Sequence, residues 1–182
     1  MKIFFKNLFQ LILHPAHGWE DIARENVSAR VPATRGLFPL IVLAALSVFM
    51  APVYHSDVSV VKLVIESIAT FSMFFPSYFI GTFVLVMFLG PSLNEPLDEN
   101  RCRTFALYTI GLLTLITLIL NCFPFLETFG MFMPIYVAII QWKGALYLNV
   151  KAERTGHFML LAVLGVLVPP YLIYFLFSMI IK

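Results

Sequence analysis

The sequence predicts an all-α integral membrane protein with five transmembrane helices that follow a short amphipathic interfacial N-terminal segment. Two observations carry this prediction. Of the 182 residues, 60% are hydrophobic and only 12% are charged, whereas about 25% of residues are charged in soluble domains. The apolar residues also gather in long runs, each near the roughly 20 residues that a helix needs to cross hydrocarbon. A chain of this composition cannot cover a surface that faces water.

Five apolar segments define the expected spans. They lack the two-residue alternation of membrane β-strands, so helices are the structure that satisfies their backbone groups within lipid. The stretch "FPF" is nearly the whole connection between the third segment and the fourth, which predicts that these two helices are antiparallel neighbours. The expected helices are residues 37–54, 58–89, 104–122, 125–148 and 158–181.

Lysine and arginine residues predict how the chain is threaded, because they accumulate on the cytoplasmic side of membrane proteins. All but two of the 12 basic residues fall on one side of the expected bundle. The exceptions are Lys62 and Lys182. The sequence therefore predicts a cytoplasmic N-terminal segment over residues 1–36, a transmembrane bundle over residues 37–182, and a C-terminus on the opposite side.

The N-terminal segment contains the most polar stretch near the start of the chain, "HPAHGWEDIARE". Before it, polar side chains recur every four residues and form one stripe on an otherwise apolar helix, which is typical of a helix at the lipid–water boundary. Pro15 is expected to end that helix, and a second short helix is expected over residues 19–26. We expect Phe4, Phe5 and Trp19 to anchor the segment to the membrane.

A metal site is the alternative interpretation of the same stretch. His14 and His17, with Glu20 or Asp21, have spacings at which ligands can converge on one helical face. Pro15 and a nearby glycine are expected to interrupt that face, and no cysteine lies close by. Anchoring is therefore the favoured interpretation, and we expect no metal or other cofactor.

Polar residues and prolines within the expected spans are the remaining candidates for a site. Lys62 and Glu66 are four residues apart and are expected to pair at the outer boundary, while Gln141 lies inside the fourth span. These three residues could form a polar site within the bundle. Interior prolines remove backbone donors and kink helices. The expected kinks are at Pro76, Pro134, Pro169 and Pro170.

Together these features favour a non-enzymatic multispan protein that scaffolds or organises a membrane. The sequence contains no catalytic or phosphate-binding motif, so we expect no enzyme activity. Its net charge of +2 and the absence of a basic run also exclude nucleic-acid binding. The expected partners are the lipid bilayer and other membrane proteins that contact the N-terminal segment. The alternatives are a small transporter or channel that uses the proline-broken helices, and a membrane-embedded enzyme.

The order of these features resembles the bacterial branch of the Yip family, the Ypt/Rab GTPase-interacting membrane proteins. The stretch "LHPAHGWEDIARE" leads into five spans, and "CRTFALYTIG" enters the third. The resemblance implies five spans, a cytoplasmic N-terminus and a bacterial cytoplasmic membrane. The chain lacks the long N-terminal region of the eukaryotic relatives, so GTPase binding is not carried over. The matching positions are Pro15, Trp19, Ile22, Phe105, Tyr108 and Gly111.

Overall fold

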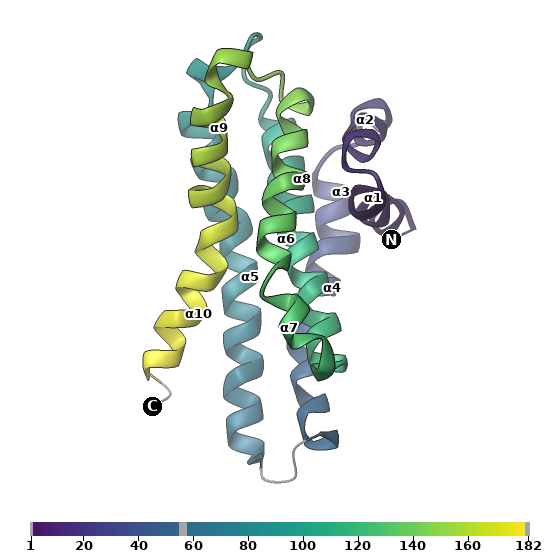
Figure 1. The fold of residues 1–182 in the computed structure, drawn as a ribbon, viewed down its shortest axis with the longest axis vertical. Helices are drawn as coiled ribbons and strands as arrows, with labels where there is room; N and C mark the ends of the chain where they lie inside the picture. Colours follow the sequence, from purple (N-terminus) through teal and green to yellow (C-terminus); the bar gives the residue numbers. More distant parts are fainter. Residues whose placement is uncertain (1, 55–57, 181–182) are drawn as a thin grey trace.

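The computed structural model describes residues 2–54 and 58–180. In this part of the chain the ordered elements are helices, joined by turns and by one isolated antiparallel bridge between Leu93 and Val150. The long helices lie side by side along the longest axis of the molecule (Figure 1). Residues 181 and 182, which include the end of the fifth expected span, lie outside the described residues.

Four helical segments are long and apolar enough to cross a membrane, and a fifth is present if one bent pair counts as a single span. The bent pair corresponds to the expected span 125–148. It joins the segment Pro124–Gly130, which consists of η4 (Pro124–Leu126) and α7 (Glu127–Gly130), to α8 (Met133–Tyr147) at an angle of 53°. The long segments are Arg30–Val53, Val60–Phe88 (α5), Glu99–Cys122 (α6) and Ala152–Met179. These helices are compatible with a multi-pass membrane protein, as predicted, although the fourth expected span is broken.

Two of the long segments are composite. Each contains a π-helical segment that comes directly before a helix with proline in its first turn. In the first, the amide of Phe38 donates to the carbonyl oxygen of Ala33, and in the last the amide of Val168 donates to that of Val163. The first contains α3 (Arg30–Pro32), η1 (Ala33–Leu37), α4 (Phe38–Ser47) and η2 (Val48–Val53). The last contains η5 (Ala152–Arg154), α9 (Thr155–Ala162), η6 (Val163–Leu167) and α10 (Val168–Ile180).

The prolines predicted to kink helices behave differently from one another. Helix α5 continues through Pro76 without a break, and the Ser77 hydroxyl donates to the Met73 carbonyl oxygen. Pro134 lies in the first turn of α8, directly after the bend, where a missing amide hydrogen costs little. The pair Pro169–Pro170 lies in the first turn of α10, directly after the wide turn of η6. Pro76 is thus accommodated within one helix, whereas the other prolines mark helix starts.

Helix α6 is the centre of the bundle. Every residue from Thr104 to Leu115 is buried, although half of a surface helix would face outwards. Around it, the outward faces of the other long segments are apolar, with large exposed side chains such as Phe83, Leu164 and Phe175. Soluble monomers rarely expose apolar surface on this scale. The packing therefore fits a bundle whose outer surface faces lipid.

Two short helices precede the bundle, α1 (Lys2–Leu13) and α2 (Pro15–Glu25). Both lie beside one end of the long helices and run across them rather than along them (Figure 1). The predicted end of α1 before Pro15 is confirmed. Helix α2 starts four residues earlier than predicted, because Pro15 is preorganised for the first turn of a helix.

The same end of the bundle gathers the segments that carry most of the basic residues. The Ala29 amide donates to Asn100 Oδ1 over 2.8 Å, and Arg101 Nη1 donates to the Tyr147 carbonyl oxygen over 3.3 Å. The turn η3 (Gly90–Ser92) is joined to the segment after α8 by the Lys151 amide, which donates to the Ser92 carbonyl oxygen. We call this end, formed by residues 2–35, 89–103 and 143–157, the basic end.

Candidate functional site at the basic end of the bundle

Helices α1 and α2 are joined through the polar stripe of α1 and the carboxylates of α2. Lys6 Nζ lies 3.4 Å from Glu25 Oε1, and Asn7 Nδ2 donates to Glu25 Oε2 over 2.6 Å. One turn further along, Gln10 Nε2 donates to the carboxylate of Asp21. Lys6, Asn7 and Gln10 of α1 therefore contact carboxylates of α2.

The indole of Trp19 fixes α2 to the bundle. Trp19 is 2% exposed, and its Nε1 donates to the Ile140 carbonyl oxygen in α8 over 2.9 Å. Its ring stacks on Phe105 of α6 and on Tyr147 of α8, each with centroids 5.2 Å apart. Tyr108 meets its edge at 90°. One side chain thus connects α2 to two of the long helices.

Phe4 fixes α1 in the same way. It is 1% exposed, and its ring stacks on Tyr108 with centroids 5.6 Å apart. Two glycines make room for it: a Cβ atom on Gly36 would lie 2.3 Å from Phe4 Cγ, and one on Gly111 would lie 3.1 Å from Phe4 Cζ. The ring therefore occupies a socket between η1 and α6.

The predicted membrane anchors must be corrected. Phe4 and Trp19 are buried in protein, so the prediction that their side chains anchor the segment in lipid is wrong, and Phe5 is half-buried. The aromatic rings bind the bundle because it offers flat partners, glycine sockets and a carbonyl for the indole N–H. The large apolar side chains of α1 that do face outwards are Ile3, Phe9 and Leu13, which are 52%, 54% and 70% exposed. The sequence pattern of α1 does not distinguish the face that packs on the bundle from the face that points outwards, because both are apolar.

The predicted metal candidates lie at the start of α2. His14 is the residue before the first turn, and His17 Nδ1 lies 3.3 Å from Glu20 Oε2 on the exposed face. Over residues 2–54 and 58–180, no group of three metal-ligating side chains is close enough to hold an ion. Gly18 does not interrupt α2, contrary to expectation. Its missing side chain lets Leu11 approach, where a Cβ atom would lie 2.9 Å from the Leu11 backbone.

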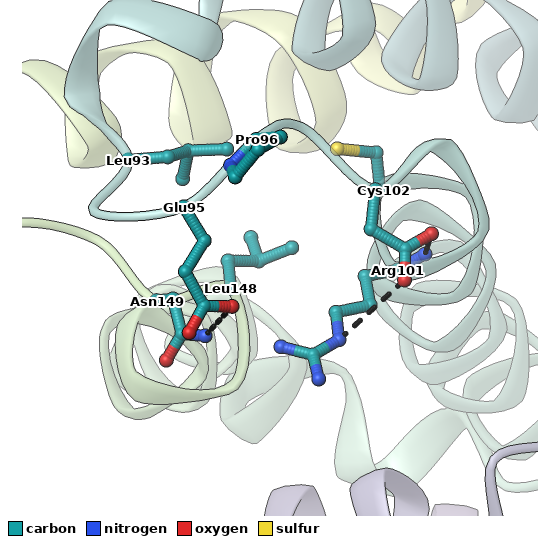
Figure 2. Close-up of a pocket in the computed structure, with 8 residues that line it drawn as sticks. Leu93, Glu95, Pro96, Arg101, Cys102, Leu148 and Asn149 are labelled. Carbon is teal, nitrogen blue, oxygen red and sulfur yellow. Dashed lines mark hydrogen bonds and ion pairs between the residues drawn. The ribbon is translucent and has the colours of Figure 1, made fainter.

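A small polar cavity of about 100 Å³ opens in the loops of the basic end (Figure 2). On one side, Asn149 Nδ2 donates to Glu95 over 2.9 Å. On the other, Arg101 Nε lies 3.6 Å from Asp98. Cys102 lines the same cavity, but its side chain is buried. Glu95 is thus paired with Asn149, and Arg101 with Asp98. We interpret these contacts as links between the loops and not as a binding site for a ligand.

The loops also contain a serine–histidine contact that sequence inspection missed. Ser92 Oγ lies 2.7 Å from His157 Nδ1. Ser92 is 1% exposed, and no carboxylate partner of His157 is found among the described residues. A nucleophilic serine needs access to substrate and a base that is itself oriented by a third group. The contact joins η3 to the start of α9.

The three residues proposed for a polar bundle site are not brought together. Lys62 and Glu66 form the predicted pair, with Lys62 Nζ 3.8 Å from Glu66 Oε1, in the first turns of α5. Gln141 is fully buried on α8, where its Nε2 donates to the Ala162 carbonyl oxygen over 3.1 Å, at the start of η6. It lines neither of the two described cavities. The transporter alternative, which expected a polar cavity at Gln141, stays a prediction.

Comparisons with family models, with curated proteins and with solved structures each found no significant match. The resemblance to the Yip family therefore stays a prediction. Five of the six positions that carry it meet in space around the N-terminal helices. Trp19 contacts Phe105 and Tyr108, Gly111 receives Phe4, and Ile22 belongs to the same core. These positions share one structural task, which is to hold α1 and α2 on the bundle.

Proposed function

We propose that this chain is a non-enzymatic multi-pass membrane protein that acts as a scaffold, with α1 and α2 as a fixed platform on its cytoplasmic side. The observation that carries the proposal is the locking of Trp19 and Phe4 into α6, α8 and η1. A segment that only anchored the chain to lipid would not need a stacked, hydrogen-bonded socket in the protein interior. Because buried side chains hold both helices in place, we expect their backbone to move little when a partner binds.

The outward face of α2 is the surface that we expect partners to contact. Its exposed residues include His17, Glu20 and Arg24, while Trp19 and Ile22 point into the bundle. Charged, exposed side chains on a rigid element give an interface specificity and faster association. The accumulation of lysine and arginine at the basic end supports the proposed cytoplasmic location of this face, and the proposed membrane is the bacterial cytoplasmic membrane.

Site-specific photo-crosslinking in intact cells tests the platform. A photoreactive amino acid at Glu20 or at Arg24 is expected to trap the same protein, because both positions lie on one exposed face of α2. The same group at Val53, at the opposite end of the first long segment, serves as the control. Adding Trp19→Ala should abolish the crosslinks from α2. Crosslinks to lipid alone, or turnover of a lipid by the reconstituted protein, would contradict the proposal.

A further inference from the structure

A second cavity, of about 120 Å³, lies where α1 and α2 meet the bundle. Its walls come from α1, α2, the start of the first long segment and α6. The lining residues include Asn7 and Glu25 on one side, Tyr108 on another, and Arg35 with Val31 at the rim. Neither the platform nor the socket of Phe4 explains why space is left here between charged groups.

The inner end of the cavity holds an acceptor without a partner. Asn7 is 1% exposed, and its Nδ2 donates both to Glu25 Oε2 over 2.6 Å and to the Tyr108 hydroxyl oxygen over 3.1 Å. Its Oδ1 is buried and has no hydrogen-bond partner among the described residues. Buried polar atoms are nearly always paired, because an unpaired one keeps the full cost of desolvation. Glu25 is already paired with Lys6, whose Nζ lies 3.4 Å from Glu25 Oε1, so the acceptor that lacks a partner is Asn7 Oδ1 alone. This acceptor calls for a ligand that donates hydrogen bonds, and the neighbouring carboxylate favours a donor that carries a positive charge.

The outer end of the cavity has the opposite charge. Arg35 is exposed and forms no ion pair with a described residue. A guanidinium is well suited to phosphate, which it can bind through two hydrogen bonds. Ile3 and Val31 stand at the same rim and are about half exposed, at 52% and 46%. The cavity therefore runs from an acceptor-rich interior to a cationic mouth with an apolar border.

We propose that this cavity binds a primary ammonium group joined to a phosphate, the chemistry of a phosphoethanolamine headgroup. The ammonium donates to Asn7 Oδ1 and to Glu25, and the phosphate lies against Arg35. The cavity has room for the aminoethyl part of the headgroup, since a cavity of roughly 150 Å³ holds benzene and this part has fewer non-hydrogen atoms. The phosphate lies outside the cavity, at the exposed Arg35 of its rim. The apolar rim favours a phospholipid over the free headgroup as the source. A choline headgroup, with a quaternary ammonium, has no N–H to offer Asn7 Oδ1.

This inference rests on the proposed membrane scaffold with a docked α1 and α2. Native mass spectrometry of the delipidated full-length protein, titrated with phosphatidylethanolamine and with phosphatidylcholine of the same acyl chains, tests it. We expect at least a tenfold preference for phosphatidylethanolamine, the effect of one hydrogen bond to a charged group. Free O-phosphoethanolamine is added as a competitor. If O-phosphoethanolamine displaces phosphatidylethanolamine only weakly, a phospholipid is the ligand. If it displaces the lipid when both are at the same concentration, the free headgroup is the ligand.

Two variants and two matched controls decide whether this cavity is responsible. Glu25→Gln and Arg35→Gln should each lower the affinity for phosphatidylethanolamine about tenfold. The controls Glu20→Gln and Arg24→Gln change the same residue types on the exposed face of α2, away from the cavity, and should leave affinity unchanged. Because Glu25 also contacts α1, Arg35→Gln is decisive if hydrogen exchange shows α1 released in the Glu25 variant.

Equal binding of the two lipids, or an unchanged preference in Arg35→Gln, would overturn the headgroup site. Hydrogen exchange of residues 2–25 in the wild-type protein separates this result from a failure of the scaffold proposal. If these residues stay protected while the lipid preference is absent, the headgroup site alone is wrong. If they exchange freely in a bilayer, the platform itself fails.

Discussion

The indole of Trp19 meets two requirements at once. Its rings need apolar, flat neighbours, and its N–H needs an acceptor when it is buried. Phe105 and Tyr147 supply the first and the Ile140 carbonyl supplies the second. At the residue scale, docking of the N-terminal helices therefore depends on the fit of one indole between two aromatic rings and on its hydrogen bond to a backbone carbonyl. Gly144 is part of this fit, because a Cβ atom there would lie 3.0 Å from the indole.

Truncation of Trp19 should release the N-terminal helices without unfolding the long ones. Trp19→Ala removes a fully buried indole, a change that typically costs about 3–5 kcal/mol. Hydrogen exchange should increase over residues 2–25, while α6 stays protected. Trp19→Phe is the control, since it keeps an aromatic ring, loses the hydrogen bond and should cost only about 1 kcal/mol beyond the lost contact area. Equal protection of residues 2–25 in wild type and Trp19→Ala would show that the socket does not hold the segment.

At the scale of elements, the π-helical segments place small residues where another helix must come close. Segment η1 contains Gly36, which receives Phe4, and η6 contains Gly165, where a Cβ atom would lie 2.5 Å from Val84 of α5. A π-helical turn carries an extra residue and is frequent at functional positions in helices. Each π-helical segment ends shortly before a proline, η1 before Pro39 and η6 before Pro169. The helix therefore changes its backbone hydrogen-bond pattern close to the position where proline lacks an amide hydrogen.

Filling the socket in η1 should detach α1 in particular. Gly36→Ala forces a Cβ atom against the ring of Phe4, and overpacking of this kind costs about 1–3 kcal/mol. Limited proteolysis should then cleave within residues 2–13 faster than in wild type. Gly90→Ala is a matched control, because nothing lies within 4 Å of the added atom. Combining Gly36→Ala with Phe4→Leu should recover part of the resistance, and a lack of recovery would mean that the two residues do not share one site.

At the scale of the whole molecule, the bundle has two different ends. The basic end joins the N-terminal segment, the loop before α6 and the loop after α8 through backbone and side-chain hydrogen bonds. At the other end, the contacts among the residues that the structure describes include the Tyr54 hydroxyl donating to the Cys122 carbonyl oxygen over 2.7 Å. The distribution of lysine and arginine between the two ends is the basis of the orientation that we propose for the chain in a membrane.

Cysteine accessibility in intact cells tests this orientation. In a background with Cys102→Ser and Cys122→Ser, a membrane-impermeant maleimide should label Val53→Cys without lysis and Gly156→Cys only after lysis. Both positions are exposed, and the glycine has open space around it. The reverse pattern would place the basic end outside the cytoplasm. Labelling of both without lysis would contradict a transmembrane bundle.

Local composition and spacing were enough to predict the helical class, the approximate bounds of the long apolar helices, the end of α1 before Pro15 and the pairing of Lys62 with Glu66. The separation of the basic segments from the remainder was equally readable, since charge position along the chain is explicit. Only the tertiary structure decided which apolar face of α1 packs inwards, where Trp19 binds, and that Asn7, Glu25 and Arg35 share a cavity. In a chain whose helices are apolar on nearly every side, periodicity does not distinguish a protein neighbour from lipid. That choice is made by the shape of sockets such as Gly36 and by carbonyl acceptors such as Ile140, which form only when distant segments are packed together.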